Sequence, residues 1–510
     1  MTTISQRASC QVRRSRLTLA ALAVTLASLT APATAATFQY RHYVQGVTAS
    51  PTKETNQAAA DILVALTGGP SLSPGMVNVP YSFDLNGLLS VTGDPAYSAS
   101  NVKWEINAGE LPAGLTLNAS GVLSGTPTTK NLSGSNFQVV ATYKTKSGQH
   151  AYTIVVNGEV LQATQISSGG SHTCAVTTAG ALKCWGNNEY GQLGNGTRVS
   201  SLVPVSVVEL TSGVAFVSAG YAHTCAIDAA GIGKCWGYGE QGQLGPLSAF
   251  YNTTPVIVSN TQKFRALATG GNHTCGVAQD GAVFCWGHNA RGQLGDNSTN
   301  MSATLRPVAG ITAAAITAGS AHTCAITTAG AANCWGRADY GQLGYGGQPS
   351  FIPGPVQVAG LASGVTAISS GSLHTCAVVS GAAVCWGLNN QGQLGDGSSN
   401  VAAAPVSVSG LSSGVSRIAT GDSHSCASLL DGRVKCWGYN GQGALGDGTN
   451  IGKNVPALAA GVAGASHVTA GTHFTCAITT QGPKCWGNNA NGQLGNNSTT
   501  NSNTPVDVTP

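Results

Sequence analysis

The hydrophobic positions of this chain fall in short runs that are separated by Gly-, Asn- and Ser-rich segments. From about residue 160 the same order of runs returns again and again. Each copy has an apolar segment such as ISSGG, then HTCAVT, a turn, ALKCWG, a loop ending in GQLG, a polar stretch and a run such as PVSV. Short apolar runs bounded by turn residues are typical of β-strands. Each copy therefore predicts four short strands.

The spacing of the copies predicts how these strands are arranged. The steps between copies are 51, 50, 49, 52, 50 and 50 residues, measured on the first cysteine of each copy, at 174, 225, 275, 324, 376, 426 and 476. A period near 50 residues indicates a solenoid or a propeller. A β-solenoid usually has shorter coils, and its coils do not need four strands each. Seven units of four strands predict a seven-bladed β-propeller.

A second alternating pattern precedes the repeats. From about residue 67 the runs VNVPYSFDL, VKWEI, LTLNASGVLSG, FQVVATY and AYTIVV are separated by turn signals. This pattern predicts a small immunoglobulin-like β-sandwich. The fold class is therefore all-β, with the sandwich before the propeller. In the segment before the sandwich, FQYRHYV is compatible with a strand and QAAADILVAL with a short helix.

The first residues have the pattern of a signal peptide. The basic stretch QVRRSR precedes the apolar stretch LTLAALAVTLASLTA, and Ala33-Thr34-Ala35 offers small residues at a cleavage site. The apolar stretch is short for a membrane span, although an uncleaved anchor is the alternative. We predict a signal peptide at 1–35, an extension at 36–66, the sandwich at 67–159 and the propeller at 160–510. The mature chain is then exported without a membrane span and is periplasmic, on the cell surface or secreted.

The net charge of the chain gives no indication of a nucleic-acid partner. Charged residues make up only 8% of the chain, and the formal net charge is +4. Four arginines lie within the first sixteen residues, so the mature chain is close to neutral. Nucleic-acid binding depends on a basic surface, and the sequence gives no indication of one.

The cysteines indicate disulfides. Cys10 lies within the predicted signal peptide, and its removal leaves 14 cysteines, an even number, in an exported chain. HTCAVT and ALKCWG predict the two arms of a hairpin in which the cysteines face each other at a spacing of ten or nine residues. A metal site is the weaker alternative, because no C-x-x-C pair exists. By the chain-entropy model each bond contributes about 2.5–3 kcal/mol. The predicted pairs are Cys174–Cys184, Cys225–Cys235, Cys275–Cys285, Cys324–Cys334, Cys376–Cys385, Cys426–Cys436 and Cys476–Cys485.

Other residues of the repeat also predict structural roles. A Trp follows the second cysteine in every copy, and side chains alternate faces along a strand, so we expect it to pack against a neighbouring blade. A His occupies one slot in six copies, whereas the seventh copy has Phe474 there and His473 one position earlier. A residue used six times is more consistent with a buried, hydrogen-bonded group than with catalysis. In GQLG we expect an inward Leu and a Gln that bonds nearby backbone.

These copies resemble the regulator of chromosome condensation repeat family. The shared pattern is G-x-x-H-[ST]-x-A followed by W-G-x-N-x-x-G-Q-L-G, as in GYAHTCAI with KCWGYGEQGQLG, over about 166–509. Ala444 replaces the Gln in the sixth copy, and Gly239 and Ala338 replace the Asn in two others. The resemblance implies a seven-bladed propeller. Its best-known activity is guanine-nucleotide exchange on a nuclear GTPase with chromatin binding, whereas other members are protein-binding platforms, some of them secreted by bacteria.

The segment LPAGLTLNASGVLSGTPTT, at 111–129, resembles immunoglobulin and cadherin-like modules of bacterial surface proteins. Such domains can hold Ca²⁺ between acidic loops. Here Asp84, Asp94, Glu105 and Glu110 are scattered, so we expect neither a metal nor a cofactor.

The sequence favours binding over catalysis. No paired carboxylates, nucleophile elbow, P-loop or zinc signature is visible, so we expect no catalytic residue. The residues that differ between copies at fixed loop positions are the candidate partner-binding residues, since Tyr and Arg are enriched in interface hot spots. They are Tyr190, Tyr238, His288, Arg291, Arg337, Tyr340 and Tyr439.

The expected partner is an extracellular or cell-surface protein, and three different functions stay open beside it. A lectin-like propeller would bind carbohydrate through exposed aromatic loops. A polysaccharide-active enzyme would need a cluster of acidic or basic groups at the central channel. A guanyl-nucleotide exchange factor is implied by the family resemblance alone.

Overall fold

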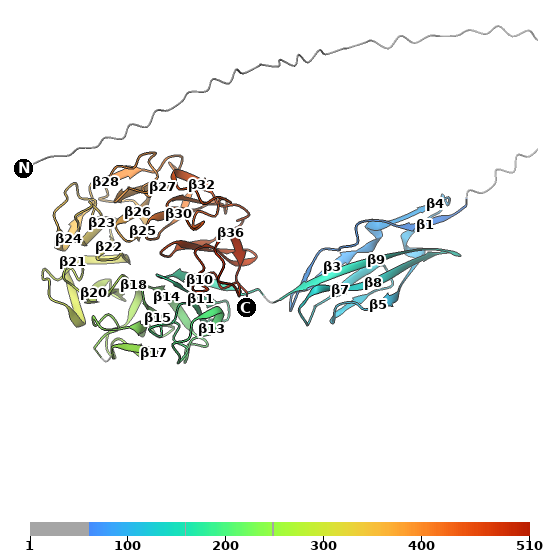
Figure 1. Cartoon of the computed structure of the whole chain (residues 1–510), viewed down its shortest axis with the longest axis horizontal. Coiled ribbons are helices and arrows are strands. Elements are labelled where there is room, and N and C mark those ends of the chain that lie inside the picture. The colour runs from blue at the N-terminus through green and yellow to red at the C-terminus, as the bar shows by residue number, and fades with distance from the viewer. Residues whose placement is uncertain (1–60, 159, 247–248, 510) are drawn as a thin grey trace, which may run out of the picture. The chain divides into compact units, whose positions relative to one another are not determined.

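The computed structural model describes residues 61–158, 160–246 and 249–509, and Figure 1 shows the two groups of sheets that they form. The fold class predicted from the sequence, a small sandwich followed by a seven-bladed propeller, is confirmed. The predicted signal peptide at 1–35 and residues 36–60 of the extension lie outside the described residues. The predicted domain limits remain predictions.

The immunoglobulin-like module consists of a four-stranded sheet in the order β2-β9-β8-β5, a three-stranded sheet in the order β3-β7-β6 and the pair β1-β4. Two short 3₁₀ turns, η1 (Leu85–Leu88) and η2 (Ala99–Asn101), connect strands. The strands are β1 (Leu63–Leu66), β2 (Gly75–Met76), β3 (Tyr81–Asp84), β4 (Leu89–Thr92), β5 (Val102–Gly109), β6 (Leu115–Leu117), β7 (Val122–Gly125), β8 (Asn131–Tyr143) and β9 (Lys146–Asn157).

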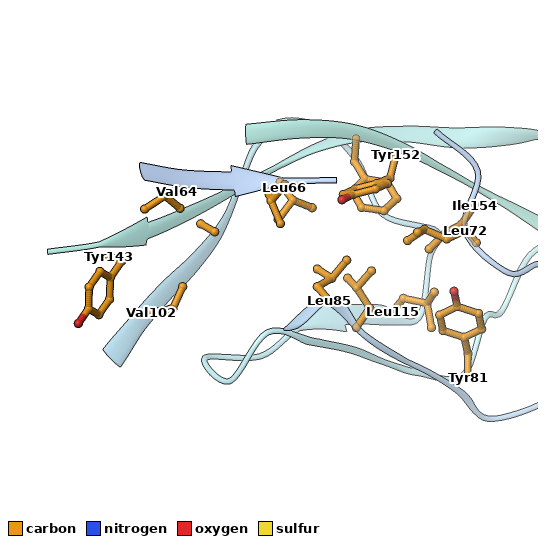
Figure 2. Close-up of a cluster of buried hydrophobic side chains, with 14 of the residues drawn as sticks. Val64, Leu66, Leu72, Tyr81, Leu85, Val102, Leu115, Tyr143, Tyr152 and Ile154 are labelled. Atoms are coloured by element: carbon orange, nitrogen blue, oxygen red, sulfur yellow. The ribbon is translucent and has the colours of Figure 1, made fainter. Parts of the chain in front are cut away.

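Alternating side chains from these strands form one apolar core (Figure 2). Tyr152 and Ile154 of β9 are buried in it, as strand alternation requires. The short helix expected around QAAADILVAL is wrong over Leu63–Leu66, which forms β1. Val64 and Leu66 alternate into the core while the backbone pairs with β4, so packing overrides the local helix preference. This strand precedes the limit of 67 predicted for the sandwich.

The propeller has seven antiparallel four-stranded blades, numbered 1 to 7 along the chain, whose strands we letter A to D in chain order. Neighbouring A strands contact one another around the whole ring, so the A strands are innermost. The A strands are β10 (Ala163–Ser168), β14 (Val214–Ala219), β18 (Phe264–Thr269), the second part of β21 (Ser302–Ala318), β25 (Val365–Ser370), β29 (Val415–Thr420) and β33 (His467–Ala470). The B strands are β11 (His172–Thr177), β15 (His223–Asp228), β19 (His273–Ala278), β22 (His322–Thr327), β26 (His374–Val379), β30 (His424–Leu429) and β34 (Phe474–Thr479).

The C and D strands complete each blade toward its outer edge. The C strands are β12 (Leu182–Gly186), β16 (Gly233–Tyr238), β20 (Ala282–Gly287), β23 (Ala332–Arg337), β27 (Ala382–Gly387), β31 (Val434–Gly438) and β35 (Gly482–Gly487). The D strands are β13 (Ser201–Ser206), β17 (Tyr251–Ile257), the first part of β21, β24 (Phe351–Gln357), β28 (Ala402–Ser407), β32 (Lys453–Leu458) and β36 (Ser502–Asp507).

The ring closes without exchange of strands between the two ends of the propeller. Blade 1 is built from β10 to β13 and blade 7 from β33 to β36, and β33 contacts β10. Closure therefore rests on contacts between neighbouring blades, which we call joints. Joint 7–1 connects the last blade to the first.

The seven disulfides join strands B and C within each blade. Cys174 lies directly opposite Cys184, and Cys376 lies directly opposite Cys385, so spacings of ten and nine residues both bring the cysteines face to face. The Cα atoms of all seven pairs are 4.0–4.1 Å apart, the short spacing of a non-hydrogen-bonded antiparallel pair. All fourteen cysteines are fully buried. The shorter hairpin turns at Ser380-Gly381, where both residues have positive φ, as a two-residue hairpin turn requires.

Candidate functional site: the loop face

The turns between strands A and B and the loops between strands C and D share one face of the propeller. In blade 2 the backbone N–H of Tyr238, the first residue after Trp-Gly, donates to the carbonyl of Ala222 in the A–B turn at 2.9 Å. The same bond forms in the other six blades, from Asn187 to Ser171, His288 to Asn272, Arg337 to Ala321, Leu388 to Leu373, Tyr439 to Ser423 and Asn488 to His473. We call this surface the loop face.

The repeated Asn and Gln hold the C–D loop in one shape in the four blades that have both residues. Gln192 accepts a bond from the Tyr190 backbone N–H at 2.9 Å, and Asn188 accepts one from the Leu193 N–H at 2.9 Å. The Leu of the GQLG sequence is fully buried in all seven blades. Asp296, Asp396 and Asp447 each accept from a backbone N–H two residues later, so they stabilise the next turn.

The middle of each C–D loop anchors the next blade. The backbone carbonyl of Gln192 in blade 1 accepts from the Trp236 indole N–H at 2.9 Å and from the Thr224 hydroxyl at 2.9 Å, both in blade 2. Because the acceptor is backbone, Ala444 serves equally well in the sixth copy, where Trp486 and Thr475 donate to it. The seven Trp are fully buried at these joints, so they pack between blades as expected.

The repeated histidines close the same network. His172 in blade 1 contacts the Thr224 hydroxyl in blade 2, with 2.8 Å between His172 Nε2 and Thr224 Oγ1. That hydroxyl already donates its proton to Gln192, so Nε2 must carry the ring proton and donate. Nδ1 then has a free lone pair, and this buried atom has no partner in any of the six copies.

Burial keeps these six rings neutral. Desolvation lowers the pKa of His172 and His374 to about 4 and the pKa of His223, His273, His322 and His424 to about 3. Joint 7–1 differs, because Phe474 occupies the slot and no ring nitrogen faces Thr173. Thr173 and Trp185 still donate to the Gln493 carbonyl there, at 2.9 and 3.0 Å.

An aromatic cluster crosses from blade 1 to blade 2 on the loop face. The Tyr190 and Tyr238 rings meet edge to face with centroids 5.0 Å apart, and Phe250 follows 6.1 Å from Tyr238. Tyr251 contacts Phe250, and the Arg198 guanidinium lies 4.5 Å above the Tyr251 ring. Phe250 is 57% exposed. The Tyr238 hydroxyl donates to Glu240, and this bond raises the pKa of Tyr238 to about 12.

A second cluster lies on blade 4. Arg337 forms an ion pair with Asp339 at 2.8 Å, and its guanidinium lies 5.4 Å from the Tyr340 ring centroid. Arg291 from blade 3 also acts electrostatically on Asp339. Of the other two predicted residues, Tyr439 packs on His473 at 4.9 Å and His288 bonds the Gln293 side chain at 2.9 Å. The seven predicted residues therefore fall into two clusters and two separate positions. Tyr190 and Tyr238 belong to the aromatic cluster, and Arg291, Arg337 and Tyr340 belong to the cluster on blade 4. His288 and Tyr439 each stand apart from both clusters.

A pocket of about 290 Å³ lies on the propeller axis, between the inner ends of the A strands and the A–B turns. Its wall includes one glycine from each blade, at 169, 220, 270, 319, 371, 421 and 471. A Cβ at Gly270 would lie 2.5 Å from the Gly319 carbonyl oxygen of the next blade, so backbone forms the wall. Among the described residues that line it, Asp422 is the only one with a charged side chain.

Sequence reasoning missed four of these residues. Phe250 ends a C–D loop that is irregular in blade 2, so it matches no repeated position, whereas Tyr251 begins β17 at the position that Phe351 occupies in β24. Tyr221 and Asp422 follow the axial glycines, in a slot that reads Gly170, Tyr221, Gly271, Ser320, Ser372, Asp422 and Thr472. A comparison of the seven copies at this slot would have found them.

The described residues contain no group of three or more His, Cys, Asp or Glu side chains placed to hold a metal ion. In the same part of the chain, no helix has the length and apolar character that crossing a membrane requires. Asp94 of the immunoglobulin-like module instead binds Lys144 at 2.6 Å and accepts from the Tyr143 hydroxyl at 2.8 Å.

Comparison with family models agrees with this architecture. The model described as RCC1-like domain matches residues 117–400, and models for the regulator of chromosome condensation (RCC1) repeat match 380–428, 431–478 and 485–510. An Ig domain model matches residues 64–157.

Comparison with curated proteins and solved structures shows partial relatives. The chain is 33% identical to the human E3 ubiquitin-protein ligase HERC2 over 246 residues, which is 46% of this chain but 5% of HERC2. It is 42% identical over 82 residues to the ultraviolet-B receptor UVR8 of Arabidopsis thaliana, covering 16% of this chain and 19% of UVR8. The chain thus spans a fifth or less of these relatives.

Two solved structures share the fold. Prp20p of Saccharomyces cerevisiae has a TM-score of 0.58 at 21% identity, covering 66% of this chain and 87% of Prp20p. Human WBSCR16 has a TM-score of 0.55 at 21% identity, covering 63% of this chain and 87% of WBSCR16.

Proposed function

Since this chain belongs to the family defined by the RCC1-like domain, we propose that it is an exported, non-enzymatic protein that uses the loop face of its propeller to bind another protein. RCC1-like propellers bind protein partners; Prp20p, for example, binds Gsp1p and histones. The role of this chain as adhesin, inhibitor or surface scaffold lies within the proposal.

The observation that carries the proposal is the contrast between fixed loop backbones and variable loop side chains. The same backbone bond fixes the C–D loop in all seven blades, yet the residue that makes it is Asn, Tyr, His, Arg, Leu, Tyr or Asn. Loops held on a rigid scaffold are suited to recognition. The cluster of Tyr190, Tyr238, Phe250 and Tyr251 offers the aromatic anchors typical of interface hot spots.

Charge indicates the kind of partner surface. The loop face, including the strand residues that flank its loops, has more acidic than basic side chains, so we propose that the contacting surface of the partner is basic overall. The acidic residues are Glu189, Glu240, Asp296, Asp339, Asp396, Asp422 and Asp447, and the basic ones are Arg198, Arg291, Arg306, Arg337 and Lys453.

Export is supported by the fourteen cysteines of the propeller, all of which are paired within their blades. Disulfides persist in oxidising compartments and are rare in the cytosol. Intact-mass analysis of protein from the culture medium or periplasm tests this point. We expect a chain shortened by cleavage near residue 35 with no free thiol. A full-length chain with fifteen free thiols in the cytosol would contradict export.

Affinity capture tests the binding function. The mature protein is used as bait against extracellular extracts, and bound proteins are quantified by mass spectrometry. The variant Tyr238→Ala, Arg291→Ala, Tyr340→Ala should lose most of the captured partner while its unfolding temperature stays close to that of the parent. The matched control is Glu209→Ala, Leu430→Ala, Arg433→Ala on the opposite face, where Leu430 is 79% exposed. Equal capture by both variants would exclude the loop face.

Carbohydrate binding is the second candidate, favoured by exposed rings on the loop face, namely Tyr221 at 66% and Phe250 at 57% exposure. Such rings can stack on sugars, so a glycan panel separates this function from protein binding. Catalysis and nucleotide exchange have less support. A polysaccharide-active enzyme would need a cluster of charged groups at the axis, and the described wall of the axial pocket has Asp422 alone. Nucleotide exchange on a nuclear GTPase would not fit an exported chain.

A further inference from the structure

The axial pocket opens among the A–B turns, so it lies within the loop face. Its volume of about 290 Å³ is at the lower end of the range for ligand sites, which suits one side chain or one small molecule. The seven blades contribute equivalent residues to the wall, so each slot can be compared with six internal controls.

Two residues break the sevenfold equivalence of the slot after the axial glycine. Five blades have Gly, Ser or Thr there, whereas blade 2 has Tyr221 and blade 6 has Asp422. Blades 2 and 6 are three joints apart, the largest separation that a ring of seven allows, so Tyr221 and Asp422 lie on opposite sides of the axis. The pocket therefore has Tyr221, which is 66% exposed, on one side and Asp422, whose carboxylate accepts from the Ser423 hydroxyl at 3.0 Å, on the other.

Small residues, several of them with hydroxyl groups, form the rest of the wall. One residue before each axial glycine the wall has Ser168, Thr269, Ser370 and Thr420, and the other three blades have Ala. The hydroxyl oxygens of Ser168 and Ser370 are shielded from solvent and have no hydrogen-bond partner. One residue after the glycine, Ser320, Ser372 and Thr472 line the pocket without being fully buried. Thr269 and Thr420 bond to Ser218 and Ser369. No Lys or Arg lines the described wall.

We infer that the axial pocket is a binding site for a protonated primary amine, with Asp422 as counter-ion and the Tyr221 ring facing the cation from across the pocket. An ammonium is a compact charge with three donors, and the pocket offers one carboxylate and several hydroxyl oxygens. A cation over a tyrosine face is also favourable. The amine is either the end of a Lys side chain on the partner or a free small amine.

This inference deepens the proposed function, because it takes the loop face to be the binding surface. The inference is tested with small molecules and the proposed function with protein capture. Amine binding can therefore fail while protein capture succeeds, and protein capture can fail while amine binding succeeds. The probes are n-butylammonium and the peptide Ac-Gly-Lys-Gly-amide. Their binding to the mature protein is measured by saturation-transfer NMR titration. Butan-1-ol and Ac-Gly-Gly-Gly-amide are their uncharged counterparts.

We expect binding of the charged probes only. Asp422→Asn should weaken it about tenfold, the usual effect of losing a hydrogen-bonded charge, and Tyr221→Ala about two- to fivefold. The matched control is Glu209→Gln, which removes an exposed carboxylate from the opposite face, outside the pocket, and should leave binding unchanged. Circular dichroism and the unfolding temperature check that each variant is folded.

The two probes distinguish the sources of the amine. Tighter binding of the Lys peptide than of n-butylammonium would indicate a partner side chain, whereas binding of n-butylammonium alone would indicate a free amine. Either result supports the site. Absence of binding by both probes, equal binding of butan-1-ol, or equal affinity in Asp422→Asn would overturn it.

Discussion

The interior of the propeller repeats nearly the same residues from blade to blade, whereas its loop face has different residues in different blades. At all seven joints the same Trp donates to an equivalent backbone carbonyl beside a Thr or Ser hydroxyl, and six of the joints also have the His. On the loop face the residue after Trp-Gly is repeated in only two pairs of blades. The two regions are adjacent in sequence, since a buried Trp is followed within two residues by a variable loop residue.

This difference separates residues that maintain the ring from residues available for recognition. A side chain used at all the joints serves a geometry that all blades share. A side chain that occurs at one blade only, such as Asp422 or Phe250, cannot be required by that shared geometry. Interior substitutions should therefore change stability, and loop-face substitutions should change binding.

The largest expected effect is acid destabilisation through the six buried histidines. Their pKa values in the folded protein are about 3–4, well below the ordinary 6.5. The unfolded chain takes up these protons first, so stability is complete above pH 6.5 and is lost as the pH falls toward 4. Six protons correspond to a loss of about 8 kcal/mol per pH unit near pH 5. Urea unfolding at a series of pH values measures the slope.

A single substitution checks that the interior causes this slope. His273→Phe should reduce the proton uptake on unfolding near pH 5 by about one, whereas the loop-face variant Tyr238→Ala, which removes a group with a pKa of about 12, should not. A free energy of unfolding that is constant between pH 7 and pH 5 would show that the histidines are not buried as neutral rings.

The next largest effect is loss of a buried Trp. Trp286 is fully buried, packs beside Phe264 and donates to the Gln243 carbonyl. Trp286→Ala should lower the free energy of unfolding by about 3–5 kcal/mol. The loop-face control Tyr238→Ala, two residues downstream of an equivalent Trp, should cost less than about 1 kcal/mol, as is usual away from the core. Similar losses in both variants would remove the distinction between the two regions.

Removal of one disulfide should have a smaller effect. The pair Cys275→Ala, Cys285→Ala should lower the free energy of unfolding by about 2.5–3 kcal/mol. The corresponding pair at Cys376 and Cys385, which closes a nine-residue spacing, should cost nearly the same. Partner capture should be retained, because the bonds are buried away from the loop face. Loss of capture at unchanged stability would place the disulfides in the binding function.

Repetition explains why so much of the interior could be predicted from the sequence. Seven copies fix the period, the strand number and the facing cysteines, and the alternation of side chains places Trp on the opposite side of the strand from Cys. The Gln that bonds the backbone and the inward Leu of GQLG follow from the same local geometry. The sequence does not show that Trp and Thr donate to a backbone carbonyl of the preceding blade. Because the acceptor is backbone, Ala444 is tolerated in place of Gln.

The loop face could be predicted only in part, because its arrangement depends on contacts between different blades. Tyr190 and Tyr238 are 48 positions apart in the chain, and only the ring brings them together. Phe250 lies in an irregular loop, and Asp422 acquires its significance from the axial pocket that all the blades enclose. Leu63–Leu66 was missed for a related reason, since its partner strand and core lie elsewhere in the module.

The smallest expected effect concerns joint 7–1, where the interior itself departs from repetition. His223→Phe reproduces the arrangement of joint 7–1 at joint 2–3. Thr274 keeps its bond to the Gln243 carbonyl, so no buried donor loses its partner, and the loss should be about 1 kcal/mol, the net value of one hydrogen bond. Phe474→His should have the opposite sign, because Thr173 already donates to Gln493 and its oxygen can accept from a ring N–H. Guanidinium unfolding of both variants at pH 8, where the rings are neutral, measures the difference. A gain at joint 7–1 would show that closure of the ring is its weakest contact, whereas a loss of several kcal/mol there would show that the Phe474 ring is the better fit against the axial glycines.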